Sequence, residues 1–210
     1  MANAISFTNV IASFPNLITP ESNKDFPNSP KKFALDLILT PDNQAFAQFM
    51  EEIGKQAVEK WKDKANLVLQ SIQADRRLRC FGNGHEKIKK ATMLPYEGYA
   101  GMRYISASSN EDRPPIIFKP EDGRAIDNLN TMERTAAARK IYGGCRVNVA
   151  VRPWLQDNAA GRAVRCELIA VQFCGDGTPF GDVAPDVTGM FGAVQSAAPD
   201  PAASALPAWM

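Results

Sequence analysis

Two arginines and a tryptophan recur at even positions of one alternating segment of the chain. The odd positions hold Cys145 and then three valines, whereas the even positions include Arg146, Arg152 and Trp154. Because successive side chains of a strand point to opposite faces, this pattern predicts a strand with one buried face and one exposed face. Rings stack on bases and arginines bind phosphates, so the exposed face has the composition of a single-stranded nucleic-acid surface. The same residues equally fit a structural interpretation, in which Trp154 caps a barrel end and the arginines pair with acids such as Glu167.

Three further residues are expected to extend this face. Tyr142 comes just before the strand, and Arg103 and Tyr104 are neighbours in an earlier segment. Tyrosine rings add stacking surface and a guanidinium adds a phosphate contact.

A basic segment at residues 76–92 is the second candidate for phosphate binding. It contains six cations and, up to residue 90, a single acid, Glu86; the cations are Arg76, Arg77, Arg79, Lys87, Lys89 and Lys90. Its centre, Phe81 to His85, contains two glycines and suits a loop that closes over a nucleic-acid strand. The alternative is a solvated face, which is what a run of charges usually forms.

The elements that must position these residues follow from periodicity. Alternation predicts strands at residues 5–12, 33–39, 101–107, 115–119, 145–154 and 162–173. Apolar residues at three-and-four spacing predict one long amphipathic helix at about 41–73, starting at Thr40-Pro41-Asp42. The proline-rich stretch 14–30 is expected to be a loop, and residues 130–140 a short helix. The fold class is therefore mainly β with one long helix, α+β.

The charges divide the chain into a basic body and an acidic tail. The whole chain has 24 basic and 23 acidic residues, but residues 175–210 contain four aspartates and no lysine or arginine. The body therefore carries a net charge of +5, and basic surface attracts phosphates by releasing their counterions. We expect one domain at 1–180 and a flexible, weakly acidic tail at 181–210, because the tail is rich in Ala, Pro and Gly.

Several classes of protein are excluded or disfavoured by the sequence. No apolar run reaches the roughly 18 residues of a membrane span, and the N-terminus lacks a secretory pattern. Four cysteines without dense spacing fit a reducing cytosol, so a cytoplasmic location is expected. There is no phosphate-binding loop, His85 has no evident nucleophile partner, and no zinc spacing is present. We therefore expect neither enzymatic activity, nor a metal, nor another cofactor.

The stretch Ile141-Tyr142-Gly143-Gly144-Cys145-Arg146-Val147-Asn148-Val149 resembles phage-encoded single-stranded DNA-binding proteins. That family includes a group long known only as a domain of unknown function, related to the replication protein of short-tailed coliphages. The similarity extends over about residues 100–181. Its other parts are Ser106 to Ser109, Arg113-Pro114-Pro115, Asp122-Gly123, Leu168 to Phe173 and Asp176 to Gly181.

The resemblance implies an OB-fold, a five-stranded Greek-key barrel with a helix packed on it, that binds single strands across one face. It also implies a role in replication, recombination and repair of phage DNA in the host-cell cytoplasm. In that family an acidic tail ending in an aromatic residue recruits replication proteins such as a polymerase or helicase. Here Asp200 is the only acid among the last twenty residues and Trp209 is penultimate. A homodimer through an edge strand is also compatible with the sequence.

Three alternatives remain open at this level. An OB protein that binds RNA or acts as an RNA chaperone has the same features, because nothing in the sequence identifies a reader of the 2′-hydroxyl. A module that binds a protein partner through the Trp154 face is a second alternative. A metal-dependent nuclease using scattered acids is a remote third.

Overall fold

The computed structural model describes residues 3–22 and 26–181 of the chain. Its strands are β1 (Ile5–Glu21), β2 (Lys32–Leu39), β3 (Phe81–Asn83), β4 (Arg103–Asn110), β5 (Ile116–Phe118), β6 (Arg146–Asn158) and β7 (Gly161–Gly175). Its helices are α1 (Gln44–Trp61), α2 (Ala65–Ala74) and α3 (Thr131–Arg139), with 3-10 turns η1 (Lys62–Lys64), η2 (Arg76–Leu78) and η3 (Gly84–Glu86). No helix in these ranges is long and apolar enough to cross a membrane.

Five of the strands close into a barrel. The sheet order is β3-β4-β2-β1-β6-β7-β5, and an additional pairing joins β4 to β7. That pairing is parallel and consists of the single register pair Ser108 and Glu167. The ring β1-β2-β4-β7-β6 is the partly open, five-stranded barrel of an OB-fold, which confirms the expected fold class.

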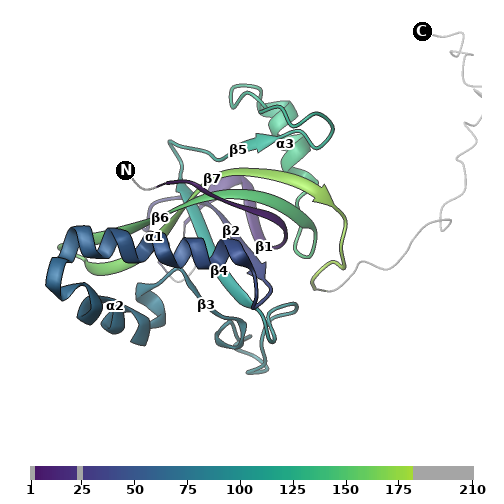
Figure 1. Ribbon diagram of the computed structural model, residues 1–210. Helices are drawn as coiled ribbons and strands as arrows, with labels where there is room; N and C mark the ends of the chain where they lie inside the picture. The colour runs from purple at the N-terminus through teal and green to yellow at the C-terminus, as the bar shows by residue number, and fades with distance from the viewer. Residues whose placement is uncertain (1–2, 23–25, 182–210) are drawn as a thin grey trace, which may run out of the picture.

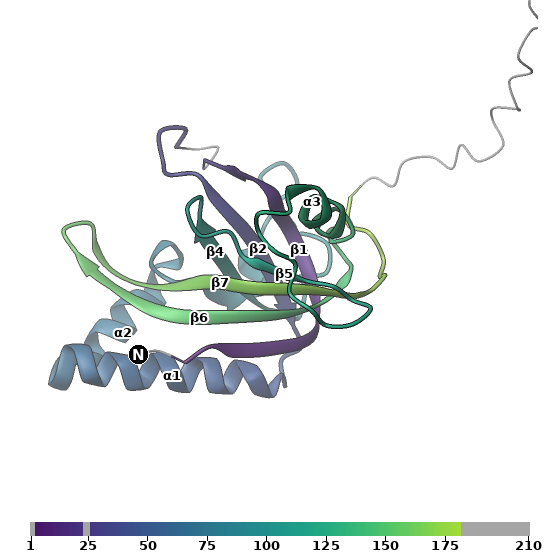
Figure 2. The same cartoon turned by 90° about the horizontal axis from the view of Figure 1, so that it is seen from above.

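The barrel interior is filled by the apolar positions of the alternating strands. In β6 the valines at 147, 149 and 151 are buried, whereas the residues between them face outward. Helix α1 lies across one end of the barrel (Figures 1 and 2) and buries Phe46, Phe49 and Ile53 against it. Phe49 contacts the barrel residue Phe7, with their ring centroids 6.3 Å apart. The one-sided apolar stripe predicted from the sequence is therefore core rather than binding surface.

The single helix predicted at about 41–73 is wrong in its start and its continuity. The helix begins after Asn43, whose side chain accepts a hydrogen bond from the amide of Phe46 at 3.1 Å. It ends at Trp61, because Lys62 adopts a left-handed φ of 52°. The indole Nε1 of Trp61 donates to Asp157 at 2.6 Å, which ties the helix end to the β6–β7 hairpin. The chain then turns back, and α2 lies below α1 in Figure 1.

The loop predicted at 14–30 is also wrong in its first part, since β1 continues to Glu21. The register of β1 on β2 shifts between Ser13 and Asn16, and again between Asn16 and Glu21. Pro15 and Pro20 lie within these irregular stretches, where a missing amide donor costs the sheet little.

The short helix and the long hairpin are confirmed as α3 and β6–β7. The strand β3 was missed, because it lies inside the basic segment. The tail, with Asp200 and Trp209, lies outside the described residues apart from Gly181.

Candidate nucleic-acid interface

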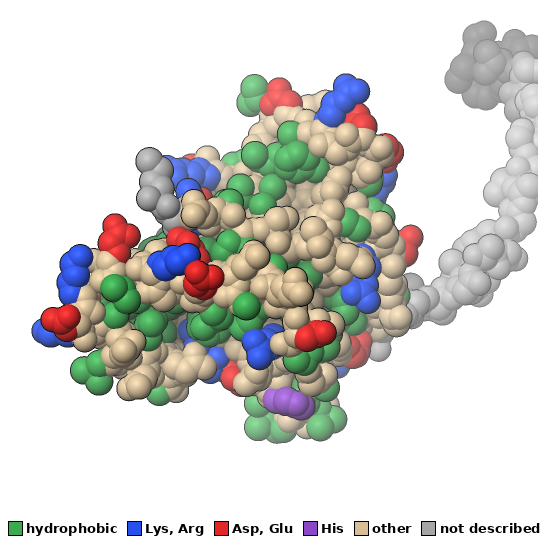
Figure 3. Space-filling model, in the orientation of Figure 1, with side chains coloured by type: hydrophobic (Ala, Val, Ile, Leu, Met, Phe, Trp, Pro, Cys, Tyr) green, Lys and Arg blue, Asp and Glu red, His purple; other side chains and the backbone are tan. Residues whose placement is uncertain are grey.

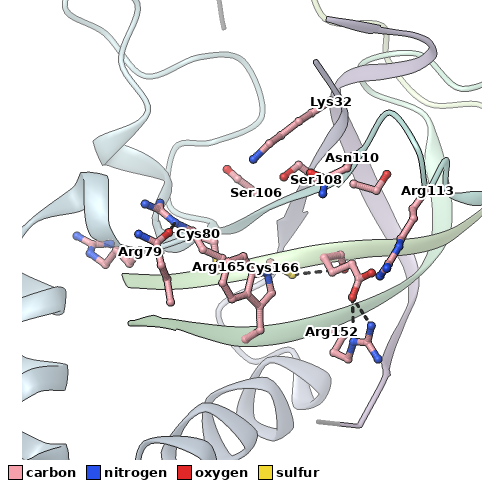
Figure 4. A pocket seen from close by; sticks show the side chains of 14 residues that line it. Lys32, Arg79, Cys80, Ser106, Ser108, Asn110, Arg113, Arg152, Arg165 and Cys166 are labelled. Carbon is pink, nitrogen blue, oxygen red and sulfur yellow. Dashed lines mark hydrogen bonds and ion pairs between the residues drawn. The ribbon is translucent and has the colours of Figure 1, made fainter. Parts of the chain in front are cut away.

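A groove of about 740 Å³ crosses the outer surface of the barrel where β4 meets β7. The outward-facing Ser106, Ser108 and Asn110 of β4 form one wall, and the far half of the β6–β7 hairpin forms the other (Figure 4). When only the five barrel strands are counted along the chain, β2 and β4 are the second and third, and the β6–β7 hairpin joins the fourth and fifth. OB-folds bind oligonucleotides at this face and beside this hairpin.

The groove is cationic. Five of its lining residues are basic and one is acidic: Lys32, Arg79, Arg113, Arg152 and Arg165 against Glu167. Cys80 and Cys166 also line it, and both are buried. Burial, and the neighbouring thiol of Cys80, raise the pKa of Cys166 well above its usual range. This thiol therefore adds no negative charge, and the groove presents an excess of positive charge to a ligand.

Trp154 is exposed on the hairpin, with 43% of its surface accessible to solvent. Its cross-strand partner in β7 is Arg165, which also lines the groove. A ring that stays exposed beside cations is available to stack on a base. This is the arrangement that the alternation of the sequence predicted for Trp154.

Arg152 lies two residues before Trp154 and is held by Glu167. Its Nε donates to Oε2 of Glu167 at 2.9 Å, and both side chains are partly exposed. The structural alternative drawn from the sequence, in which an arginine pairs with Glu167, is therefore correct for Arg152. Figure 4 shows Arg113 reaching into the groove from the opposite wall.

Three groove cations were missed by the sequence analysis. Arg165 lies opposite Trp154 in the predicted hairpin, so alternation on the return strand was a usable signal. Its guanidinium donates to Gln156 at 3.2 Å and to the carbonyl of Arg77 at 3.0 Å, so it also fixes η2 to the hairpin. Lys32 and Arg113 come from the start of β2 and from the turn after β4. Only the tertiary fold brings them together.

Arg146, which was expected on the face itself, and Tyr142 and Arg103, which were expected to flank it, lie elsewhere. Arg146 is exposed at the opposite end of β6, and its Nη1 donates to the carbonyl of Asn9 at 3.4 Å. The hydroxyl of Tyr142 donates to Asp176 at 3.0 Å, so this ring anchors the segment after β7. Arg103 lies 4.8 Å from the ring centroid of Phe46 on α1. None of the three lines the groove.

Tyr104 was expected to expose its ring for stacking, but the structure buries it. It is 2% exposed and packs with Ile38 and Tyr99 in a second, small core on the outer face of β2 and β4. Burial, reinforced by the charge of Glu86, raises the pKa of Tyr104 to about 12. Its role is structural.

The basic segment is folded rather than a free loop. It contains η2, β3 and η3, and the amide of Gly84 donates to Met102 at 2.7 Å. A Cβ at Gly84 would lie 1.7 Å from the carbonyl oxygen of Tyr99, so the two stretches of backbone are in close contact.

Four cations of this segment are paired with carboxylates: Arg77 with Asp75 at 2.8 Å, Arg79 with Glu86 at 2.9 Å, Lys87 with Asp36 at 2.7 Å and Lys89 with Glu97 at 3.1 Å. Arg76 and Lys90 are exposed, and Arg76 donates to the carbonyl of Glu86. Of the six, only Arg79 lines the groove. The segment is therefore not the open loop that the sequence predicted, and its phosphate contacts remain a prediction.

On the face that presents α1, acidic and basic side chains are interspersed (Figure 3). Within residues 3–22 and 26–181, no three His, Cys, Asp or Glu side chains are grouped as a metal site would require.

A partly open OB barrel with an exposed tryptophan in a cationic groove defines the class of OB-fold nucleic-acid-binding proteins. The particular family is given by comparison with known proteins. The family model described as the ssDNA-binding protein of Enterobacter phage Enc34 matches residues 3–198, and the chain belongs to this family. This confirms the resemblance seen in the sequence.

Individual relatives match this chain over most of their length. "Putative protein p50" of Acyrthosiphon pisum secondary endosymbiont phage 1 is 29% identical over 178 residues, which cover 84% of this chain and 85% of that protein. The structure of the single-stranded DNA-binding protein from bacteriophage Enc34 in complex with ssDNA is 23% identical, with a TM-score of 0.63, and covers 85% of this chain and 89% of that one. The crystal structure of gp2.5, a single-stranded DNA-binding protein encoded by bacteriophage T7, is 12% identical with a TM-score of 0.51, and covers 94% and 100%.

Proposed function

We propose that the protein binds single-stranded DNA without regard to sequence, and that it coats and protects the strand during phage DNA replication, recombination and repair. The observation that carries the proposal is the exposed Trp154 within a groove whose charged lining is five cations and one acid. Membership of a family described as ssDNA-binding supports it. The action is binding rather than catalysis, and its place is the cytoplasm of the host cell.

The groove accounts for binding in two parts. The exposed Lys32 and Arg113 and the partly exposed Arg165 attract the phosphates, and each contact releases condensed counterions. Trp154 stacks on a base, and every base has a π-face, so the contact is tolerant of sequence. Ser108 and Asn110 are small polar side chains that accommodate the sugar and base edges.

A fluorescence titration with oligothymidine and with a duplex of the same length, at two salt concentrations, tests the function. We expect tight binding to the single strand, weaker binding to the duplex, and a steep loss of affinity with salt. A matched RNA strand is added as competitor, because the groove contains no identified reader of the 2′-hydroxyl. Affinity that does not change with salt contradicts the electrostatic part, and absence of any binding contradicts the function.

We further propose that replication proteins are partners of the chain and that they contact its C-terminal tail, where Asp200 and Trp209 are the candidate contacts. The strands β3 and β5 end the sheet, so an edge is available for a homodimer. Light scattering of the full chain measures the oligomeric state, and a variant ending at residue 181 tests the tail in a polymerase or helicase pull-down.

A further inference from the structure

An apolar pocket of about 360 Å³ lies apart from the groove, and the proposed binding of DNA at Trp154 does not use it. Its rings are Phe14 of β1, Tyr96 of the β3–β4 connection and Phe180 of the segment after β7. Lys89 and Glu97 stand at its rim. Three segments far apart in the sequence thus bring aromatic side chains to one place on the outer surface of the barrel.

Phe14 is held there by an uncommon backbone. Its φ is 46°, which lies in the left-handed region that bulky residues rarely adopt. Its ring is nevertheless 50% exposed. The ring of Tyr96 packs edge-on against it, with the centroids 5.0 Å apart at 88°. A strained backbone persists only where the surrounding structure enforces it, and such positions cluster at binding sites. Here it holds a half-exposed ring against a second aromatic ring.

A series of side-chain contacts connects the groove to the pocket. Ser106 lines the groove, and its Oγ receives a hydrogen bond from Lys87 Nζ at 3.1 Å. The same ammonium donates to Asp36 at 2.7 Å, and Asp36 accepts from the hydroxyl of Tyr99 at 2.8 Å. The ring of Tyr99 is 6.2 Å from that of Phe14. The groove and the pocket therefore lie on the same outer side of β2 and β4, with the segment that contains Lys87 and Tyr99 between them.

The chemistry of the pocket fits a nucleobase. Aromatic walls provide stacking without selecting a base. At the rim Lys89 pairs with Glu97 at 3.1 Å, and its ammonium lies 6.0 Å from the ring centroid of Tyr96, so the ion pair stands beside the stacking surface. In the groove, Trp154 and Arg165 are cross-strand neighbours, so a ring and a cation lie close together there as well.

We propose that the pocket of Phe14, Tyr96 and Phe180 is a second base-stacking site, for the same DNA strand that occupies the groove. The inference rests on the proposed function and extends the site. The strand passes over the segment that contains Lys87 and the buried Tyr99, and a base distant from Trp154 stacks on Phe14.

The variant Phe14→Gly tests the site with little risk to the fold. Glycine adopts a positive φ without strain, so the change removes the ring and relieves the backbone. Binding is measured with oligothymidines of about 4 and about 16 nucleotides, the range of site sizes found for OB-folds. We expect the longer strand to lose affinity roughly 5- to 150-fold and the shorter strand, which fills only the groove, to bind as in wild type. Met132→Ala, which removes an 84% exposed apolar side chain on α3, is the matched control and leaves both affinities unchanged.

Cross-linking gives a readout independent of affinity. A strand substituted with 5-bromouracil is irradiated on the full chain, and the cross-linked peptides are identified by mass spectrometry. Adducts at Phe14 or Tyr96, as well as at Trp154, support the second site.

Three outcomes overturn the proposal. If Phe14→Gly weakens neither length, or both lengths equally, while Trp154→Ala weakens binding, the second site is refuted and the proposed function stands. If the wild-type chain binds neither length, the proposed function fails and the second site fails with it.

Discussion

Nε of Arg152 lies 2.9 Å from Oε2 of Glu167, and the two residues are cross-strand partners in the β6–β7 hairpin. Glu167 is the one acidic residue among those that line the groove. It therefore occupies the guanidinium that a phosphate would use under the proposed function. We expect DNA to compete with Glu167 for Arg152, so that the pair limits affinity.

Glu167→Gln is expected to tighten binding of oligothymidine. The change removes a negative charge from the groove and frees Arg152, so affinity rises by about 1 kcal/mol, or roughly five-fold, at low salt. The dependence of log K on log salt becomes steeper, because one more phosphate contact releases counterions. Glu121→Gln, an equal change of charge at a 67% exposed side chain paired with Lys140, is the control. Equal affinity for wild type and Glu167→Gln at every salt concentration would show that Arg152 does not contact DNA.

Trp154→Ala is expected to weaken binding by about 1–3 kcal/mol without unfolding the barrel. Trp154 is 43% exposed, so its loss leaves no cavity in the core. Isothermal titration gives the affinity, and thermal melting by circular dichroism gives the stability. Val58→Ala, at a 60% exposed position of α1, serves as the control. A large fall in melting temperature for Trp154→Ala would show the ring to be structural.

Arg113→Gln is expected to weaken binding similarly for all sequences and to reduce the steepness of its salt dependence. Each lost phosphate contact on a single strand lowers the slope of log K against log salt by about 0.7. Arg124→Gln, an 81% exposed arginine paired with Asp122, is the matched control. Titrations at four or more salt concentrations measure the slope. Equal slopes in the two variants would place Arg113 outside the DNA path.

Arg79→Met is expected to act on stability. Arg79 is 7% exposed at the side chain and pairs with Glu86 at 2.9 Å, so its removal leaves a partly buried carboxylate without its cation. The expected loss in the free energy of unfolding is about 3 kcal/mol, measured by urea denaturation. Arg77→Met, at an 86% exposed side chain, changes it by less than about 1 kcal/mol. A stable Arg79→Met variant that loses DNA affinity would instead support the phosphate contact that the sequence predicts for Arg79.

Alkaline pH is expected to destabilise the fold through Tyr104. Burial raises the pKa of Tyr104 to about 12, above its ordinary value of about 10, so the neutral phenol is favoured in the folded state. The stabilisation is complete below about pH 10 and is lost as pH rises through 12, amounting to roughly 2 kcal/mol by that point. Tyr104→Phe keeps the ring and is expected to reduce this dependence. Urea denaturation at several pH values measures it, and an identical pH profile in the variant would exclude Tyr104 as the source.

The local pattern of the sequence predicted the parts of the site that lie on one hairpin. Alternation over β6 placed Arg152 and Trp154 on the outer face, and the structure has them there. The same rule applied to β7 would have added Arg165. Proximity along the chain does not predict Lys32 or Arg113, which reach the groove only because β4 closes on β7.

Charge in the sequence was a weaker guide than alternation. The basic segment appeared to be one surface, but four of its cations pair with carboxylates, three of them close in sequence and one, Asp36 with Lys87, from the distant strand β2. Composition counts charges and does not reveal their partners. In the same way, helical periodicity predicted the buried face of α1 but not the turn at Lys62, because a single backbone angle ends the helix while the apolar spacing continues.

The join between β4 and β7 consists of one register pair, Ser108 with Glu167, and the groove runs along it. Under the proposed function, a nucleic-acid strand in the groove would contact both β4 and β7. Ligand binding and barrel closure would then be thermodynamically linked, since a ligand that binds the closed form stabilises it. The amides around Ser108 should therefore exchange their hydrogens more slowly once the groove is filled, and the cooperativity of the whole barrel should rise with it.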